Sequence, residues 1–76
     1  MDLVIKDFMF DLHLSGDELL VYAYLYRLQE ESKDCPNCEG IAKDLKISTR
    51  TVYRAINNLK AKELIQAIRS YRLIGN

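Results

Sequence analysis

The stretch that decides the fold is residues 41–59, IAKDLKISTRTVYRAINNL. Around it, two short runs place apolar residues at i, i+3, i+4 and i+7, the spacing of one helix face. The members are Cys38, Ile41, Ala42 and Leu45 in the first run, and Val52, Ala55, Ile56 and Leu59 in the second. Only Lys46-Ile47-Ser48 separates the runs, and Ser48 stands where its hydroxyl can cap the second helix. Two helices joined by so tight a turn must cross steeply, which predicts a helix-turn-helix.

The opposite face of the second predicted helix is rich in groups that bind nucleic acid. Arg50, Arg54 and Asn57 lie on it, flanked by Thr51, Tyr53 and Asn58. Guanidinium groups bind guanine or phosphate, amides bind adenine, and hydroxyls bind phosphate oxygens. No acidic residue occurs from Ser48 to Lys62. An ordinary solvated helix face is the alternative, but this composition favours nucleic-acid binding.

The order of residues resembles the winged helix-turn-helix family of bacterial and phage proteins, which includes transcription regulators and replication initiators. The matching residues are Ile41-Ala42, Leu45, Ile47-Ser48, Thr51-Val52, Arg54-Ala55-Ile56, Leu59 and Leu64-Ile65. The resemblance extends back through Leu14-Ser15 and Glu18 and covers about residues 14 to 69. The family often has glycine where Lys46 and Glu63 stand. A positive φ at another residue costs on the order of 1 kcal/mol, so we expect slightly different turns there.

The resemblance and the patterns together predict an α+β fold, mostly α, with three helices and a short β-strand or hairpin wing. We expect one domain over residues 1–76. It would comprise an extended N-terminal arm over 1–14, a three-helix core over 15–62 and a wing strand over 63–76. A chain of this size buries only roughly 60% of its unfolded surface, so the core must be thin.

The charges are unevenly distributed along the chain, although the formal net charge is zero. Residues 1–42 carry three basic and nine acidic side chains, whereas residues 43–76 carry eight basic and two acidic ones. The second predicted helix lies in the basic half. This asymmetry indicates a basic binding face and an acidic back.

The N-terminal segment alternates apolar and other residues before a helix begins. Phe8, Phe10, Leu12 and Leu14 alternate with Met9, Asp11 and His13, and this period of two predicts an extended segment with one buried face. Ser15 and Glu18 then form a capping-box pattern that opens a helix over about 16–31.

That helix has apolar residues on two sides. One stripe comprises Val21, Tyr24, Leu25 and Leu28, and the other comprises Leu19, Tyr22, Ala23 and Tyr26. A helix apolar on both sides is enclosed by its own domain or shared with a partner. Little of this chain remains to cover the second stripe, so we expect a homodimer. In a monomer, the N-terminal apolar residues would have to fold over this stripe.

Cys35 and Cys38 form a Cys-x-x-Cys pair with three interpretations. A structural zinc site needs four ligands, and only His13 remains in this chain, so zinc would have to be held between subunits. A redox pair lacks the strand–helix surroundings of thioredoxin-like motifs. Cys38 shares the apolar stripe of Ile41, which favours a packing role and no metal site. His13 is expected to be solvated.

The C-terminal part alternates as a strand from Leu64 to Ile74. A wing would have to turn near Arg69-Ser70, unless it is cut short. Arg69 and Arg72 are candidates for phosphate contact, with exposed charges that protect a strand edge as the alternative.

These observations predict a sequence-specific double-stranded DNA-binding domain that regulates transcription, with a recognition helix over about 49–62 in the major groove. Base contacts are expected from Arg50, Thr51, Arg54, Tyr53 and Asn57. Phosphate contacts are expected from Lys46, Ser48, Lys60, Arg69 and Arg72, and the predicted surface also includes Thr49 and Asn58. A replication-initiator module and a protein-interaction domain without DNA binding are the alternatives.

Other classes of function have little support in the sequence. It contains no nucleophile–base pair, paired-carboxylate site or phosphate-binding glycine loop, so we expect no enzyme, no cofactor and no small-molecule ligand. Neither a signal peptide nor an apolar run of transmembrane length is present, so we expect a cytoplasmic protein without membrane attachment.

Overall fold

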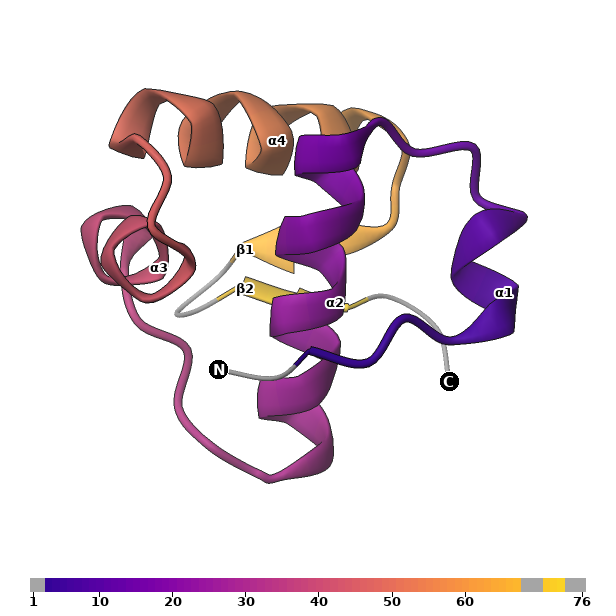
Figure 1. The fold of residues 1–76 in the computed structure, drawn as a ribbon, viewed down its shortest axis with the longest axis horizontal. Helices are drawn as coiled ribbons and strands as arrows, with labels where there is room; N and C mark the ends of the chain where they lie inside the picture. The colour runs from indigo at the N-terminus through magenta and orange to yellow at the C-terminus, as the bar shows by residue number, and fades with distance from the viewer. Residues whose placement is uncertain (1–2, 68–70, 74–76) are drawn as a thin grey trace.

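The fold of the chain is mostly helical. The computed structural model describes residues 3–67 and 71–73, and the elements there are α1 (Asp7–Phe10), α2 (Gly16–Glu30), α3 (Cys38–Leu45), α4 (Thr49–Ala61), β1 (Ile65–Ala67) and β2 (Tyr71–Leu73). Helix α2 runs through the middle of the molecule, with α4 crossing near its start, α3 and α1 on opposite sides, and the strands behind it (Figure 1). The helix-turn-helix predicted from the two apolar runs is therefore present as α3 and α4.

The core is built around α2. Five successive residues, Val21 to Leu25, are buried, so this helix is enclosed by its own domain. From α4, the predicted stripe of Val52, Ala55, Ile56 and Leu59 is buried without exception. From α3, Cys38, Ile41 and Ala42 are buried and Leu45 packs against them half-exposed. Both predicted helix faces are confirmed.

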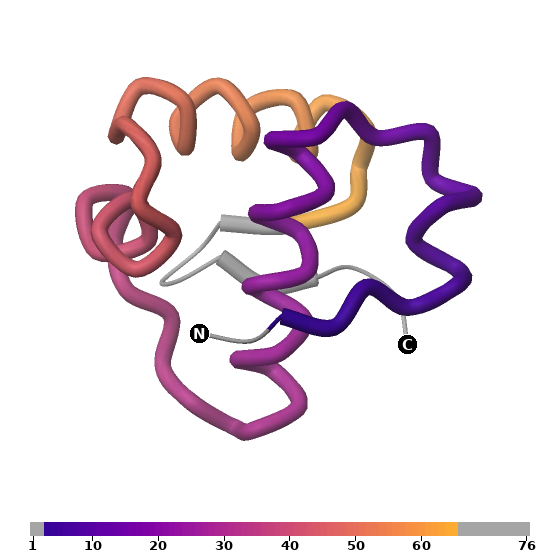
Figure 2. The backbone as a smooth tube through the Cα atoms, in the orientation of Figure 1, coloured from indigo at the N-terminus to yellow at the C-terminus, as the bar shows by residue number. Residues whose placement is uncertain are grey.

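The predicted extended arm over residues 1–14 is wrong for its central part. Residues 7–10 form the short helix α1, which adds a fourth helix to the three that were expected. In this helical turn the burial is opposite to that expected from the alternation. Met9 is fully buried, whereas Phe8 and Phe10 are 42% and 62% exposed. The backbone trace places this segment beside α2 (Figure 2).

The N-terminal segment packs against the second apolar stripe of α2, which is the arrangement that the monomer alternative required. The Phe8 ring lies 6.4 Å from the Tyr22 ring and 5.6 Å from the Tyr26 ring, measured between centroids. Tyr22 and Ala23 are buried within the single chain. The stripe therefore needs no second subunit.

Side-chain caps fix where the helices begin. The Ser15 hydroxyl accepts from the Glu18 N–H (3.5 Å) and the Glu18 carboxylate accepts from the Ser15 N–H (3.4 Å), so the predicted capping box is confirmed. The Ser48 hydroxyl accepts from the Thr51 N–H at 3.1 Å, as predicted for the cap of α4. The Asn37 side chain caps α3 in the same way.

The turns at Lys46 and Glu63 keep the left-handed geometry that glycine favours. Both residues have φ 59°, so the expectation of different turns is wrong. Each turn is closed by a hydrogen bond across six residues, from the Ile47 N–H to the Ala42 carbonyl (3.1 Å) and from the Leu64 N–H to the Leu59 carbonyl (2.9 Å). Ile47 and Leu64 pack against the core, and these contacts offset the cost of the positive φ.

The two strands pair antiparallel after α4. Ile65 lies opposite Leu73, Gln66 opposite Arg72 and Ala67 opposite Tyr71. The predicted turn near Arg69-Ser70 lies outside the described residues. Strand β1 contacts α4 and β2 contacts α2, so the pair lies against the helical core.

Candidate nucleic-acid interface

One face of α4 is exposed because the other is buried in the core. Arg50, Tyr53, Arg54 and Asn57 recur at i, i+3, i+4 and i+7 on the exposed face, and the Tyr53 residue is 56% exposed. The structure thus brings together four of the residues predicted to contact bases. Thr49 and Thr51, at the start of the helix, are half-buried.

The start of α4 carries several of the predicted phosphate contacts. Lys46 is exposed in the turn and Ser48 is exposed at the cap. The Ser48 and Thr51 hydroxyls lie 2.7 Å apart and share a hydrogen bond. The N-terminal end of a helix attracts anions, so the position of these residues is compatible with phosphate contact.

The two arginines of α4 take part in none of the ion pairs among the described residues. Within the described part of the chain, the ion pairs are Arg27–Glu31, Lys33–Glu31 and Lys62–Glu18. Arg50 and Arg54 therefore pair with no described carboxylate. Since α4 itself contains no acid, nothing on this helix offsets their positive charge.

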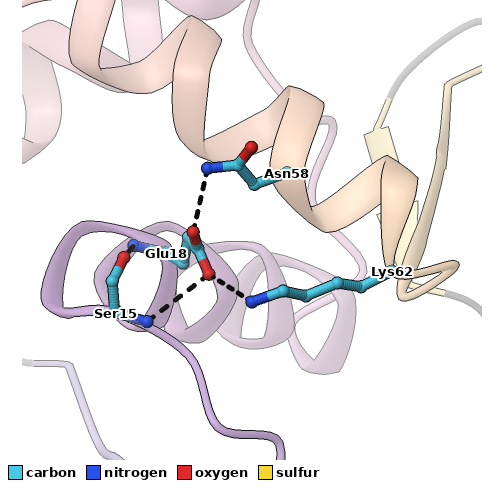
Figure 3. A network of polar contacts seen from close by, with 4 residues as sticks. All are labelled: Ser15, Glu18, Asn58 and Lys62. Carbon is cyan, nitrogen blue, oxygen red and sulfur yellow. Dashed lines mark hydrogen bonds and ion pairs between the residues drawn. The ribbon is translucent and has the colours of Figure 1, made fainter.

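Asn58 is placed differently from the other predicted contacts. Its side-chain amide donates to the Glu18 carboxylate of α2 at 2.9 Å, and the Lys62 ammonium donates to the other oxygen at 2.7 Å (Figure 3). Asn58 is exposed as a residue, but its amide nitrogen is directed toward the scaffold. Lys60, two residues along the chain, is exposed and takes part in none of these bonds.

Glu18 is the important residue that sequence reasoning recognised only as a cap. It lies on the same helix face as Val21, Tyr22 and Leu25, and it is only 7% exposed. An acid on an apolar face was the available signal, because buried carboxylates require partners. The hydrogen bond from Lys62 lowers the pKa of Glu18, and the hydrogen bonds from Asn58 and Ser15 lower it further. Desolvation of the carboxylate acts in the opposite direction and raises this pKa.

Of the two predicted wing arginines, the one within the described residues is Arg72. Arg69 lies outside the described residues. The backbone of Arg72 is in β2 opposite Gln66, and its side chain is not described.

The two cysteines and the histidine differ in how far they are buried. Cys38 is buried, as predicted for a packing residue, Cys35 is half-buried, and neither is part of a disulfide. No group of three or more potential metal ligands occurs among residues 3–67 and 71–73. His13 is exposed.

A helix-turn-helix with an exposed face of donors and no acid defines a class of domain that binds DNA. A family model described as a helix-turn-helix domain matches residues 12–65, which is more than half of the chain, and the protein belongs to this family. Comparisons with curated proteins and with solved structures gave no significant match. Among residues 3–67 and 71–73, none of the helices has both the length and the apolar composition of a membrane span.

Proposed function

We propose that the protein is a sequence-specific double-stranded DNA-binding domain that regulates transcription, without catalysis. The observation that carries this proposal is the exposed face of α4. Arginine, tyrosine and asparagine side chains lie there without an acidic neighbour on the helix, and the buried opposite face holds them in place. Helix α4 would lie in the major groove with its N-terminal end toward the bases.

The side chains divide between base and phosphate contacts. Arg50, Arg54 and Asn57 can form bidentate hydrogen bonds to base edges, and the exposed Tyr53 ring can contact a thymine methyl group. Lys46, Ser48 and Lys60 would contact phosphates on either side of the groove. We also propose that β1 and β2 form a wing, from which Arg69 and Arg72 would contact the phosphate backbone of the DNA.

Selection of bound duplexes from a random DNA pool tests the proposal. We expect a defined site of a few base pairs, and affinity that falls steeply with salt. Recovery of no consensus, together with no retention on a DNA column at low salt, would favour the alternative of a protein-interaction domain. A replication-initiator module would use the same surface, and the location of the selected site in its genome would distinguish it from a regulator.

We propose that two copies act together on a two-fold symmetric site. The support is geometric, because a single recognition helix covers only one half-site. The covered stripe of α2 adds no support, since Phe8 already packs against it. Sedimentation with and without the selected duplex tests the stoichiometry. A monomer that occupies an asymmetric site as one copy would exclude the dimer.

A further inference from the structure

Glu18 makes an unusual set of contacts between α2 and α4. Among residues 3–65, for which burial is described, it is the one charged side chain that is buried. One carboxylate oxygen accepts from the Lys62 ammonium at 2.7 Å and the Ser15 N–H at 3.4 Å, and the other accepts from the Asn58 amide at 2.9 Å (Figure 3). The carboxylate therefore joins the start of α2 to the last turns of α4.

The spacing of its partners makes this contact directional. Asn58 and Lys62 lie four residues apart, one turn along the same face of α4. Two hydrogen bonds at successive turns restrain both the rotation of α4 about its axis and its position along α2. The apolar side chains beneath α4 hold it against the core, but contacts of this kind have no fixed direction. In some proteins a buried polar group selects one register in this way.

The same contacts divide α4 into two parts. In the first, Arg50, Tyr53, Arg54 and Asn57 are exposed and bonded to no described carboxylate. In the second, Asn58 and Lys62 are directed toward Glu18, which lies on the scaffold. Each of these two side chains therefore already donates one hydrogen bond to the scaffold before any ligand arrives.

We propose that Glu18 is a positioning residue for DNA recognition, which orients α4 and keeps Asn58 and Lys62 from contacting DNA. This inference rests on the proposed function. It predicts that base specificity depends on a residue that lies on another helix and touches no base. The quantity that reports this role is the ratio of affinities for the selected duplex and for a scrambled duplex.

The central variant is Glu18→Met, which keeps the volume and removes all three acceptor contacts. We expect the affinity ratio to fall about five-fold or more, similar to the loss of one base contact. Affinity for the scrambled duplex should not fall, because a negative charge has been removed. A role in stability alone would scale both affinities together through the folded fraction. Glu18→Gln should restore much of the ratio, since its amide can still bond Ser15, Lys62 and a rotated Asn58 amide.

A second variant removes the partners instead. The double change Asn58→Ala with Lys62→Met should lower the ratio as Glu18→Met does, and combining all three changes should lower it no further. The DNA affinity of this double variant should depend on salt concentration as that of the wild type does. The matched control Lys60→Met should instead reduce the salt slope by about 0.9 and leave the ratio unchanged. This second set carries the test if Glu18→Met does not fold.

The outcomes separate this inference from the function on which it rests. A wild type without preference for any duplex would remove the proposed function, and the inference with it. A specific wild type whose folded Glu18→Met variant keeps the full ratio would overturn the inference alone. Additive losses in the triple variant, or a reduced salt slope on loss of Lys62, would also overturn it, because both would mean that Asn58 or Lys62 contacts DNA.

Discussion

The two ends of α4 differ in what their polar side chains contact. Toward the N-terminal end, Arg50 and Arg54 are exposed and pair with no described carboxylate. Toward the C-terminal end, Asn58 and Lys62 donate to the buried Glu18 carboxylate. One end presents donors to a ligand, and the other is bound to the scaffold. On the inference above, the polar groups at the C-terminal end would orient the helix, whereas those at the N-terminal end would contact DNA.

Helix α3 is held by a similar polar contact. The Tyr24 hydroxyl, on the buried middle of α2, donates to the Asp44 carboxylate at 2.6 Å. Burial raises the pKa of Tyr24, and the hydrogen bond to Asp44 raises it further. Helix α2 thus contacts both helices of the motif through polar side chains, and the apolar core supplies most of the stability.

The largest expected effect is a loss of stability when the buried apolar face of α4 is truncated. Leu59 is fully buried beneath the end of α4 that Glu18 contacts. Leu59→Ala should lower the free energy of unfolding by about 2–5 kcal/mol, because it removes buried surface and leaves a cavity. Chemical denaturation measures this change. At a temperature where the variant is folded, its ratio of specific to scrambled affinity should remain close to that of the wild type.

The next largest effect is a loss of DNA affinity without a loss of stability, at the N-terminal end of α4. Arg54→Ala should weaken binding to the selected duplex by about 1–3 kcal/mol and leave the free energy of unfolding nearly unchanged. The control Arg27→Ala changes an arginine on α2, where it pairs with Glu31, and should leave DNA affinity near that of the wild type. Equal binding by Arg54→Ala and the wild type would show that the exposed face of α4 does not contact the bases.

The features predicted from sequence are those set by short-range spacing. The apolar faces of α3 and α4 repeat every three or four residues, and the caps Ser15 and Ser48 act within three residues. Such patterns belong to one element and can be recognised without knowing its neighbours. The helix-turn-helix and the exposed part of the candidate interface were therefore predictable.

The features that were not predicted depend on contacts far apart in sequence. The Asn58 amide bonds a carboxylate 40 residues away, so the polar face alone indicated a DNA contact. Near the N-terminus, the alternation could not show that a helical turn would bury Met9 and place Phe8 against Tyr22. Period two over a few apolar residues is ambiguous when a partner surface decides which ones are buried.

The bound end of α4 should respond to acid. The hydrogen bond from Lys62 lowers the pKa of Glu18 in the folded state. The ionised carboxylate therefore stabilises the fold at pH values above the ordinary pKa of 4.5. The stabilisation is lost as pH falls through the lowered pKa. At neutral pH, Lys62→Met should cost about 0.5–1 kcal/mol, since the ammonium is partly exposed. Denaturation at several pH values should show this difference disappearing below the pKa.

A matched control for that titration lies at the other end of α2. The pKa of Glu31 is lowered by hydrogen bonds from Lys33 and Arg27, but this carboxylate is exposed. Solvent screens such pairs, so Lys33→Met should change the pH dependence of unfolding less than Lys62→Met. Equal changes in the two variants would mean that burial of Glu18 adds nothing to its contact.

The smallest expected effect compares the two turns that flank α4. Lys46 precedes the presenting end and Glu63 follows the bound end, and both have φ 59°. Lys46→Gly and Glu63→Gly should each raise the free energy of unfolding by at most about 1 kcal/mol, because relief of the positive φ is partly offset by a more flexible unfolded chain. Only Lys46→Gly should weaken DNA binding, with a salt slope smaller by about 0.9. If instead both variants kept the salt slope of the wild type, Lys46 would not contact phosphate. The DNA-binding surface would then begin at Ser48.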